Sequence, residues 1–159
     1  MASSINERRV ISVIVLNESS VLARITALFA GRGYNIESLT VAPIPDSEMS
    51  HITIATNGSA KVMEQITKQL HKLIPVYKVI EHEEMVEKEM VLVKFPISEH
   101  LSDIGVLCAA YNGGIANVGK EMIIAMVADE PKRVQHFIEA AQRYNPSEVI
   151  RGGVVAIER

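Results

Sequence analysis

The chain has 159 residues, of which 48% are hydrophobic and 22% charged, and its formal net charge is −3. This size suits one ordinary domain or two small ones with a hydrophobic core, and the negative charge disfavours nucleic-acid binding, which needs clustered lysine and arginine. The single cysteine, Cys108, excludes an internal disulfide and a multi-cysteine metal site. Without an apolar run of roughly 20 residues or a signal-peptide pattern, the sequence predicts a cytoplasmic protein.

The first predicted strand, residues 9–16, is almost wholly apolar and β-branched, as in a strand buried on both faces. A helix follows, because apolar residues recur at helical spacing between residues 21 and 29. Ser19 or Ser20 can cap its start by accepting a backbone N–H bond. The two glycines of residues 31–33 tolerate the positive φ with which helices commonly end.

Two more strands, a second helix and a third strand complete the first half. Strands are predicted at residues 36–41 and 51–56, joined by a turn rich in proline, aspartate and serine. Ser59 is a candidate cap for a helix over residues 62–73, which a proline ends before a strand at 76–80. The order β-α-β-β-α-β is the ferredoxin-like arrangement.

The second half repeats this order after a charged connector, residues 81–89, whose last residues can already belong to a strand. The predicted elements are a strand at 90–95, a helix at 101–111 ended by Gly113 and Gly114, strands at 115–118 and 122–127, a helix at 134–141, and closing strand segments at 149–150 and 154–157. We therefore predict an α+β fold of two tandem ferredoxin-like βαββαβ units, with domains at residues 1–84 and 85–159.

General catalytic signatures are missing from this sequence. It contains no G-x-S-x-G, no Walker-type phosphate loop and no G-x-G-x-x-G. The five histidines are scattered without metal-ligand spacing, which favours surface or structural roles. Cys108 lies among apolar residues in a helical pattern, which favours packing over nucleophilic chemistry. We therefore predict no catalytic residue and no metal site.

The polar segment Asn17–Ser20 lies between the first strand and the first helix. A helix that begins directly after a strand directs free N–H groups and its positive dipole end toward such a loop, where a carboxylate can bind. Asn17 offers both an amide oxygen and an NH₂ group, and Val21 and Leu22 could wall an apolar side chain. The residues alone favour an ordinary helix start, and binding of a free amino acid is the alternative.

Several stretches carry a family resemblance. "LNESSVLARITALFAGRGYNIESLTVAP" (16–43), "SHITIAT" (50–56), "VMEQITKQLHKLIPVYKV" (62–79) and "EMVLVKF" (89–95) resemble the small regulatory subunits of acetolactate synthase, also called acetohydroxyacid synthase. The match covers nearly the whole chain, is strongest over residues 9–95 and is looser over residues 96–151. "GRGYNIESLTVAP" (31–43) is its most specific part.

The resemblance implies that the first unit is an ACT domain, a βαββαβ module that binds amino acids, followed by an ACT-like ferredoxin domain. Such subunits form homodimers through paired ACT domains and join a separate catalytic subunit. That subunit uses thiamine diphosphate, Mg²⁺ and FAD to condense pyruvate with pyruvate or 2-oxobutyrate in valine, leucine and isoleucine synthesis. The small subunit carries no cofactor; it activates the catalytic subunit and confers feedback inhibition by valine.

The resemblance also assigns effector residues. The carried-over positions are Asn17, Ser19, Ser20, Val21 and Leu22 of one chain, and Asn35 and Ile36 of the partner chain. Gln65 matches a family position with an indirect effect on the valine response. Family members usually have glycine where this chain has Ser20, whose Cβ and hydroxyl enter the space near the ligand. Pairing and activation are expected to persist, while the strength of valine binding is left open.

Two other functions stay as alternatives. The chain could be a stand-alone tandem-ACT amino-acid sensor that regulates another partner, or a small ferredoxin-like enzyme with an unrecognised site. The long match at residues 33–43 favours the regulatory subunit over the sensor. The absence of any group that could replace the thiamine ylid disfavours the enzyme.

Overall fold

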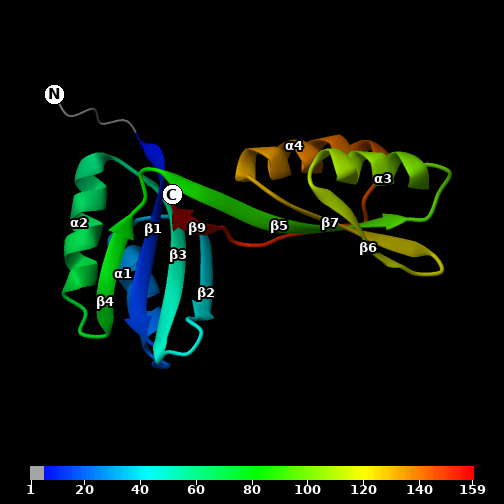
Figure 1. Ribbon diagram of the computed structural model, residues 1–159. Helices are drawn as coiled ribbons and strands as arrows, with labels where there is room; N and C mark the ends of the chain where they lie inside the picture. Colours follow the sequence, from blue (N-terminus) through cyan, green and yellow to red (C-terminus); the bar gives the residue numbers. More distant parts are fainter. Residues whose placement is uncertain (1–5) are drawn as a thin grey trace. The chain divides into compact units, whose positions relative to one another are not determined.

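The computed structural model describes residues 6–159, which form two compact units (Figure 1). Of the described residues, the first unit comprises residues 6–86 together with Ala156–Arg159, and the second comprises Glu87–Val155. Within residues 6–159, every helix is too short or too polar to cross a membrane.

The first unit is a four-stranded antiparallel sheet with two helices. Its elements are β1 (Glu7–Leu16), α1 (Val21–Gly31), β2 (Ile36–Pro43), β3 (Met49–Gly58), α2 (Ala60–His71) and β4 (Val76–Glu81). The strand order is β2-β3-β1-β4, with β1 between β3 and β4. This is the predicted βαββαβ order, and it leaves β2 and β4 at the two edges of the sheet.

The core of the first unit lies between the sheet and its helices. Alternate residues of β1, such as Ile11 and Val13, point to the helix side and are fully buried. Ile25 and Phe29 of α1 pack against them, four residues apart on one helix face. The helical spacing in the sequence thus places α1 across the sheet with its N-terminus next to the end of β1.

The second unit repeats the fold. Its elements are β5 (Met85–Pro96), α3 (Leu101–Ala110), β6 (Gly113–Val118), β7 (Met122–Asp129), α4 (Pro131–Ala141), a 3₁₀ turn (Gln142–Tyr144) and β8 (Glu148–Arg151). The last strand, β9 (Val155–Glu158), groups mostly with the first unit. The sheet order is β6-β7-β5-β8, and β9 also pairs with β5. Figure 1 shows α3 and α4 side by side over one face of this sheet.

The core of the second unit confirms the packing role of Cys108. Val93 and Phe95 of β5 and Phe137 of α4 are fully buried, and the Cys108 side chain lies in the same cluster. Burial raises the pKa of the Cys108 thiol, which keeps it protonated. A buried, protonated thiol is a poor nucleophile.

The predicted connector between the two halves is mostly strand. Only residues 82–84 separate β4 from β5, because β5 begins at Met85 rather than at Met90. The acidic residues of this stretch made it look like a connector and not like a strand. One of them, Glu89, is buried and paired with an arginine. A charged side chain can be buried in a strand where a partner neutralises it.

The glycine pair 113–114 begins β6 instead of ending α3. Asn112 has the positive φ of 58° that ends the helix. A Cβ on Gly113 would lie 2.3 Å from the carbonyl oxygen of Met126, so β6 needs glycine to approach β7. In the first unit, Gly33 has the expected positive φ, 69°, whereas Gly31 lies inside α1.

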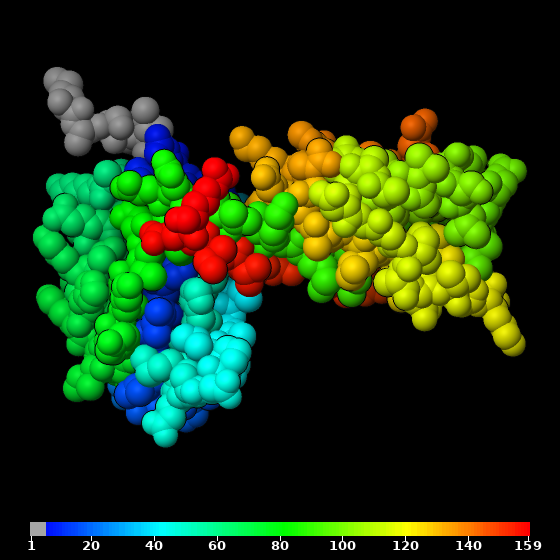
Figure 2. Space-filling model, in the orientation of Figure 1, coloured from blue at the N-terminus to red at the C-terminus, as the bar shows by residue number. Residues whose placement is uncertain are grey.

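The end of the chain departs from the predicted closing strand. β8 closes the sheet of the second unit, and Ala156–Arg159 group with the first unit (Figure 2, red). There the Arg159 N–H donates to the Glu84 carbonyl at 3.2 Å. Periodicity alone does not show which unit a short terminal strand joins.

Candidate functional site

The loop between β1 and α1 is exposed and held by its backbone. The Asn17 N–H donates to the Glu48 carbonyl at 2.9 Å, and the Glu18 N–H donates to the Leu16 carbonyl at 2.8 Å. The first bond ties the loop to the β2–β3 turn, and the second closes the loop on the end of β1. The side chains of Asn17 and Ser19 therefore face solvent from a fixed backbone.

The start of α1 offers free hydrogen-bond donors. The Val21 N–H donates to the Glu18 carbonyl at 3.3 Å, but the N–H groups of Ser20, Leu22 and Ala23 have no acceptor within residues 6–159. The first turn of α1 contains no acidic residue that could occupy this end of the helix dipole. Val21 is buried and Leu22 is 38% exposed. The N-terminal end of α1, which we call the α1 mouth and which comprises Ser20–Ala23, can therefore bind an anion next to an apolar surface.

The prediction that Ser19 or Ser20 caps α1 was wrong. Ser20 occupies the cap position, but its φ of −93° and ψ of −10° are helical and its side chain accepts no cap hydrogen bond. Capping needs an extended backbone that directs the hydroxyl at the first turn. Ser59 has this geometry, with ψ of 164°, and accepts from the Val62 N–H at 3.3 Å, as predicted.

Asn35 and Ile36 lie at the other end of the sheet from Asn17. Leu16 pairs with Met49, whereas Ile36 pairs with Thr56, seven residues further along β3. At roughly 3.3 Å per residue, these two ends are about 20 Å apart. The structure therefore brings Asn17, Ser19, Ser20, Val21 and Leu22 together but keeps Asn35 and Ile36 away from them within one chain.

Gln65 contacts the segment that leads into Asn35. The Tyr34 hydroxyl donates to the Gln65 side-chain oxygen at 3.1 Å, which links α2 to the start of β2. The Tyr34 ring packs edge-on against Phe29, with 6.4 Å between ring centroids. The Asn35 carbonyl accepts from the Thr56 hydroxyl. Gln65 therefore helps to fix the backbone of Asn35 from a distance.

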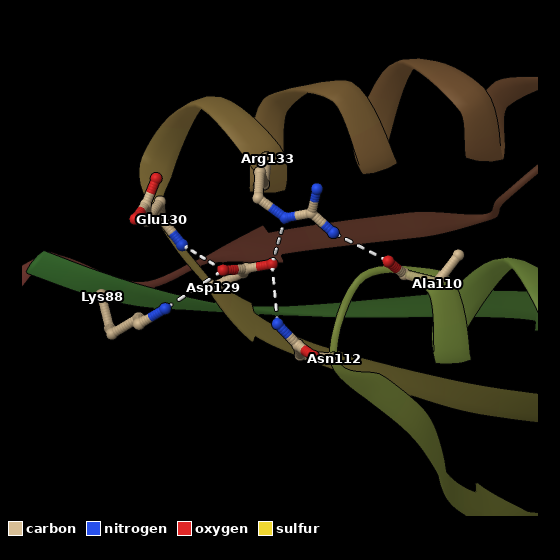
Figure 3. Close-up of polar contacts among 6 residues, drawn as sticks. All are labelled: Lys88, Ala110, Asn112, Asp129, Glu130 and Arg133. Carbon is tan, nitrogen blue, oxygen red and sulfur yellow. Dashed lines mark hydrogen bonds and ion pairs between the residues drawn. The ribbon is translucent and has the colours of Figure 1, made fainter.

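A separate polar cluster surrounds Asp129 in the second unit (Figure 3). Its carboxylate accepts from Arg133 Nε at 2.5 Å, from the Glu130 N–H at 2.8 Å, from Asn112 Nδ2 at 3.1 Å and from Lys88 Nζ at 3.2 Å. Burial by itself raises the pKa of this carboxyl, but the bonds from Arg133, Glu130 and Lys88 outweigh it and lower the pKa to about 2.

The arginine of this cluster also reaches α3. Arg133 donates to the Ala110 carbonyl at 2.7 Å and lies over the Tyr111 ring, 5.0 Å from its centroid. Opposite Asp129 on β5, the buried Glu89 pairs with Arg151. Arg151 also donates to the Gln135 side chain at 2.6 Å. These ion pairs join strands to helix ends, which is a structural role. The sequence did not predict them, because Glu89 and Arg151 are 62 residues apart and the spacing of Asp129 and Arg133, four residues along the chain, does not by itself show that the carboxylate is buried.

Two histidines lie close together in the first unit. The His82 side chain is 3% exposed; its Nε2 lies 2.6 Å from the Ser12 hydroxyl and its Nδ1 lies 3.8 Å from Glu158. Burial, and then the charge of His82, lower the pKa of His51. Within residues 6–159, no three histidine, cysteine, aspartate or glutamate side chains are grouped to hold a metal ion.

Comparison with known families identifies the two units. A family model described as "AHAS small subunit-like ACT domain" matches residues 11–78, and one described as "Small subunit of acetolactate synthase" matches residues 88–159. The chain belongs to the acetolactate synthase small-subunit family. Its first unit is thus an ACT domain, as the resemblance implied.

Individual relatives of this acetolactate synthase small-subunit family match over nearly their whole length. The "Acetolactate synthase isozyme 3 small subunit" of Escherichia coli is 40% identical over 156 residues, covering 96% of both chains. The "Acetolactate synthase small subunit" of Haemophilus influenzae is 37% identical with the same coverage. The crystal structure of the Thermotoga maritima small subunit superposes with a TM-score of 0.89 at 32% identity, covering 96% of this chain and 98% of that one.

Proposed function

We propose that this chain is a non-catalytic, cytoplasmic regulatory subunit that joins the catalytic subunit of acetolactate synthase, activates it and makes it sensitive to valine. The observation that carries the proposal is the set of unpaired N–H groups at the α1 mouth, beside Asn17. Thiamine diphosphate, Mg²⁺ and FAD would belong to the catalytic subunit. The effector would bind between two ACT domains.

Two-fold pairing of ACT domains would complete the site. β2 lies at the sheet edge, and no strand within residues 6–159 pairs with its outer side. If two copies of β2 pair in antiparallel fashion, the start of one lies beside the end of the other. The end of β2 is at the same end of the sheet as Leu16, because Pro43 pairs with Ser50 and Ser50 with Val15. Pairing would thus place the first residues of the other protomer's β2 near the α1 mouth.

The chemistry of this composite site fits a free aliphatic amino acid. The unpaired N–H groups at Leu22 and Ala23 suit the carboxylate, and Asn17 and the other protomer's Asn35 offer amide groups for the polar end. Ile36 of that protomer and Leu22 would border the aliphatic side chain. Gln65 would act indirectly, through its bond to Tyr34 next to Asn35.

Reconstitution with the catalytic subunit tests this proposal. Wild-type chain is expected to raise the initial rate of acetolactate formation, and valine is expected to lower it. Asn17→Ala should keep activation and weaken valine inhibition about 10-fold, as for the loss of one or two polar contacts. Asn57→Ala is the matched control, since Asn57 is exposed on β3. Equal inhibition of both variants, or acetolactate formation by the pure chain alone, would contradict the proposal.

Ser20 decides how closely the effector approaches the backbone. Calorimetry with valine should show tighter binding to Ser20→Gly than to wild type, because glycine removes the Cβ beside the unpaired N–H groups. Both chains should activate the catalytic subunit equally. Equally tight binding by the two chains would show that the serine side chain does not obstruct the ligand.

A further inference from the structure

The sheet of the second unit has one face without helices. Val91 and Val93 of β5 point to α3 and α4, so the alternate residues Leu92 and Lys94 point the other way. In register with them lie Ile124 and Met126 on β7, and Glu148 and Ile150 on β8. Met126 is 39% exposed and Ile150 is 56% exposed. This helix-free face is thus largely aliphatic and open to solvent.

A hollow of about 230 Å³ lies on this face, lined by Leu92, Lys94, Ile124, Glu148 and Ile150. Three of the five lining residues are aliphatic, and the other two carry opposite charges. Lys94 Nζ lies 3.2 Å from the Glu148 carboxylate, and the two side chains are 40% and 52% exposed. An exposed ion pair of this kind contributes little to stability, so its members can exchange partners readily.

We propose that this hollow binds a free aliphatic α-amino acid. The ligand carboxylate would pair with Lys94, its ammonium group with Glu148, and its side chain would cover Leu92, Ile124 and Ile150. The hollow thus offers one contact for each part of the ligand, and the ligand replaces the exposed Lys94–Glu148 contact with two of its own. Because the hollow is shallow, the expected Kd is on the order of 1 mM. This site is separate from the α1 mouth and does not depend on the function proposed for it.

Methyl NMR of the full chain tests the site. Asn17→Ala serves as background, so that binding at the α1 mouth is weakened. L-leucine is expected to shift the methyl signals of Leu92, Ile124 and Ile150 saturably, with one shared Kd. Isovalerate, which lacks the ammonium group, and isoamylamine, which lacks the carboxylate, are each expected to bind at least 10-fold more weakly.

Charge variants separate the two polar contacts. Lys94→Met and Glu148→Gln should each weaken binding of L-leucine at least 10-fold, whereas the double exchange K94E/E148K, which presents the same two charges in reverse, should bind within about 3-fold of the background. Lys68→Met is the control, since Lys68 forms a similar exposed pair with Glu64 on α2. Circular dichroism confirms that each variant is folded.

The proposal is overturned if these methyl signals do not shift saturably, or if leucine, isovalerate and isoamylamine bind alike. It is also overturned if the signals depend on protein concentration and not on leucine, because the face is then a contact between copies of the chain. Each of these results leaves valine binding at the α1 mouth intact, and loss of valine inhibition in the holoenzyme is measured separately.

Discussion

Individual buried charges in this protein are stabilised by partners from several elements. Asp129 is 2% exposed and takes hydrogen bonds from β5, α4 and the residue that ends α3. Each unit by which folding lowers a carboxyl pKa corresponds to about 1.4 kcal/mol of stability. Such a residue affects the stability of the second unit without taking part in effector binding.

Asp129→Asn is expected to lower the free energy of unfolding at pH 7 by about 2 kcal/mol, since folding lowers the pKa from 3.8 to about 2. Because the folded pKa is the lower one, this stabilisation is present above pH 3.8 and is lost as the pH falls toward 2. Urea denaturation across this range measures it. Asp46→Asn, in an exposed turn with φ of 56°, should change stability little. Equal losses of stability in both variants would contradict the stabilising role of Asp129.

His51 gives stability a second pH dependence. Its folded pKa lies below 6.5 because of burial and then His82, so the unfolded chain binds more protons and stability decreases as the pH falls through 6.5. The charged group that acts on His51 is His82, and Glu158 lies 3.8 Å from Nδ1 of His82. His51→Gln should flatten the dependence of thermal unfolding temperature on pH between about 7 and 5. His71→Gln, exposed on α2, is the control and should keep the wild-type dependence of unfolding temperature on pH. If His51→Gln also keeps that dependence, His51 is not its source.

At the scale of elements, the two helices of the ACT domain begin differently. α2 begins with a capping serine, whereas α1 begins with a serine whose hydroxyl makes no cap bond and whose neighbouring N–H groups are unpaired. Unpaired donors at a helix start cost stability unless water or a ligand satisfies them. The uncapped start of α1 therefore suits a ligand site, and the capped start of α2 suits a purely structural helix.

This difference predicts that the same substitution, serine to alanine, has a larger effect on stability at the start of α2 than at the start of α1. Ser59→Ala should reduce the free energy of unfolding by about 1 kcal/mol, because it removes the bond from the Val62 N–H. Ser20→Ala should change it by less than about 0.5 kcal/mol in the absence of valine. Urea denaturation of the two variants in one buffer provides the comparison, and a larger loss in Ser20→Ala would mean that Ser20 caps α1 in solution.

At the scale of the whole molecule, the exposed edge of β2 is the feature on which assembly depends. An unpaired strand edge favours pairing with another chain, and Val41, near the end of β2, is 42% exposed. β4 forms the opposite edge and carries Tyr77, which is 77% exposed. The proposed effector site needs pairing through β2, because only that edge begins with Asn35 and Ile36.

Val41→Asp is therefore expected to weaken the homodimer at least 10-fold, since two-fold pairing brings the two new charges near each other and removes apolar contact. Tyr77→Asp, on the other edge, should leave the dimer intact. Sedimentation equilibrium measures both. Valine binding should weaken together with dimerisation in Val41→Asp, and a monomer that binds valine as tightly as wild type would contradict the composite site.

Local sequence patterns were enough to predict much of the fold of this protein. The helical stripe from Val21 to Phe29, the alternation in the strands and the cap at Ser59 depend on neighbours in sequence, so the sequence by itself determined both βαββαβ units and the position of the Asn17–Ser20 loop. The family resemblance added the effector residues. Tertiary structure decided the rest. It buries Glu89 with Arg151 and brings lysine and asparagine side chains that are distant in sequence to Asp129. It also leaves α1 without a serine cap and places Asn35 at the far end of the sheet from Asn17. These features depend on strand register and on partners brought together only by folding, and no local periodicity encodes them.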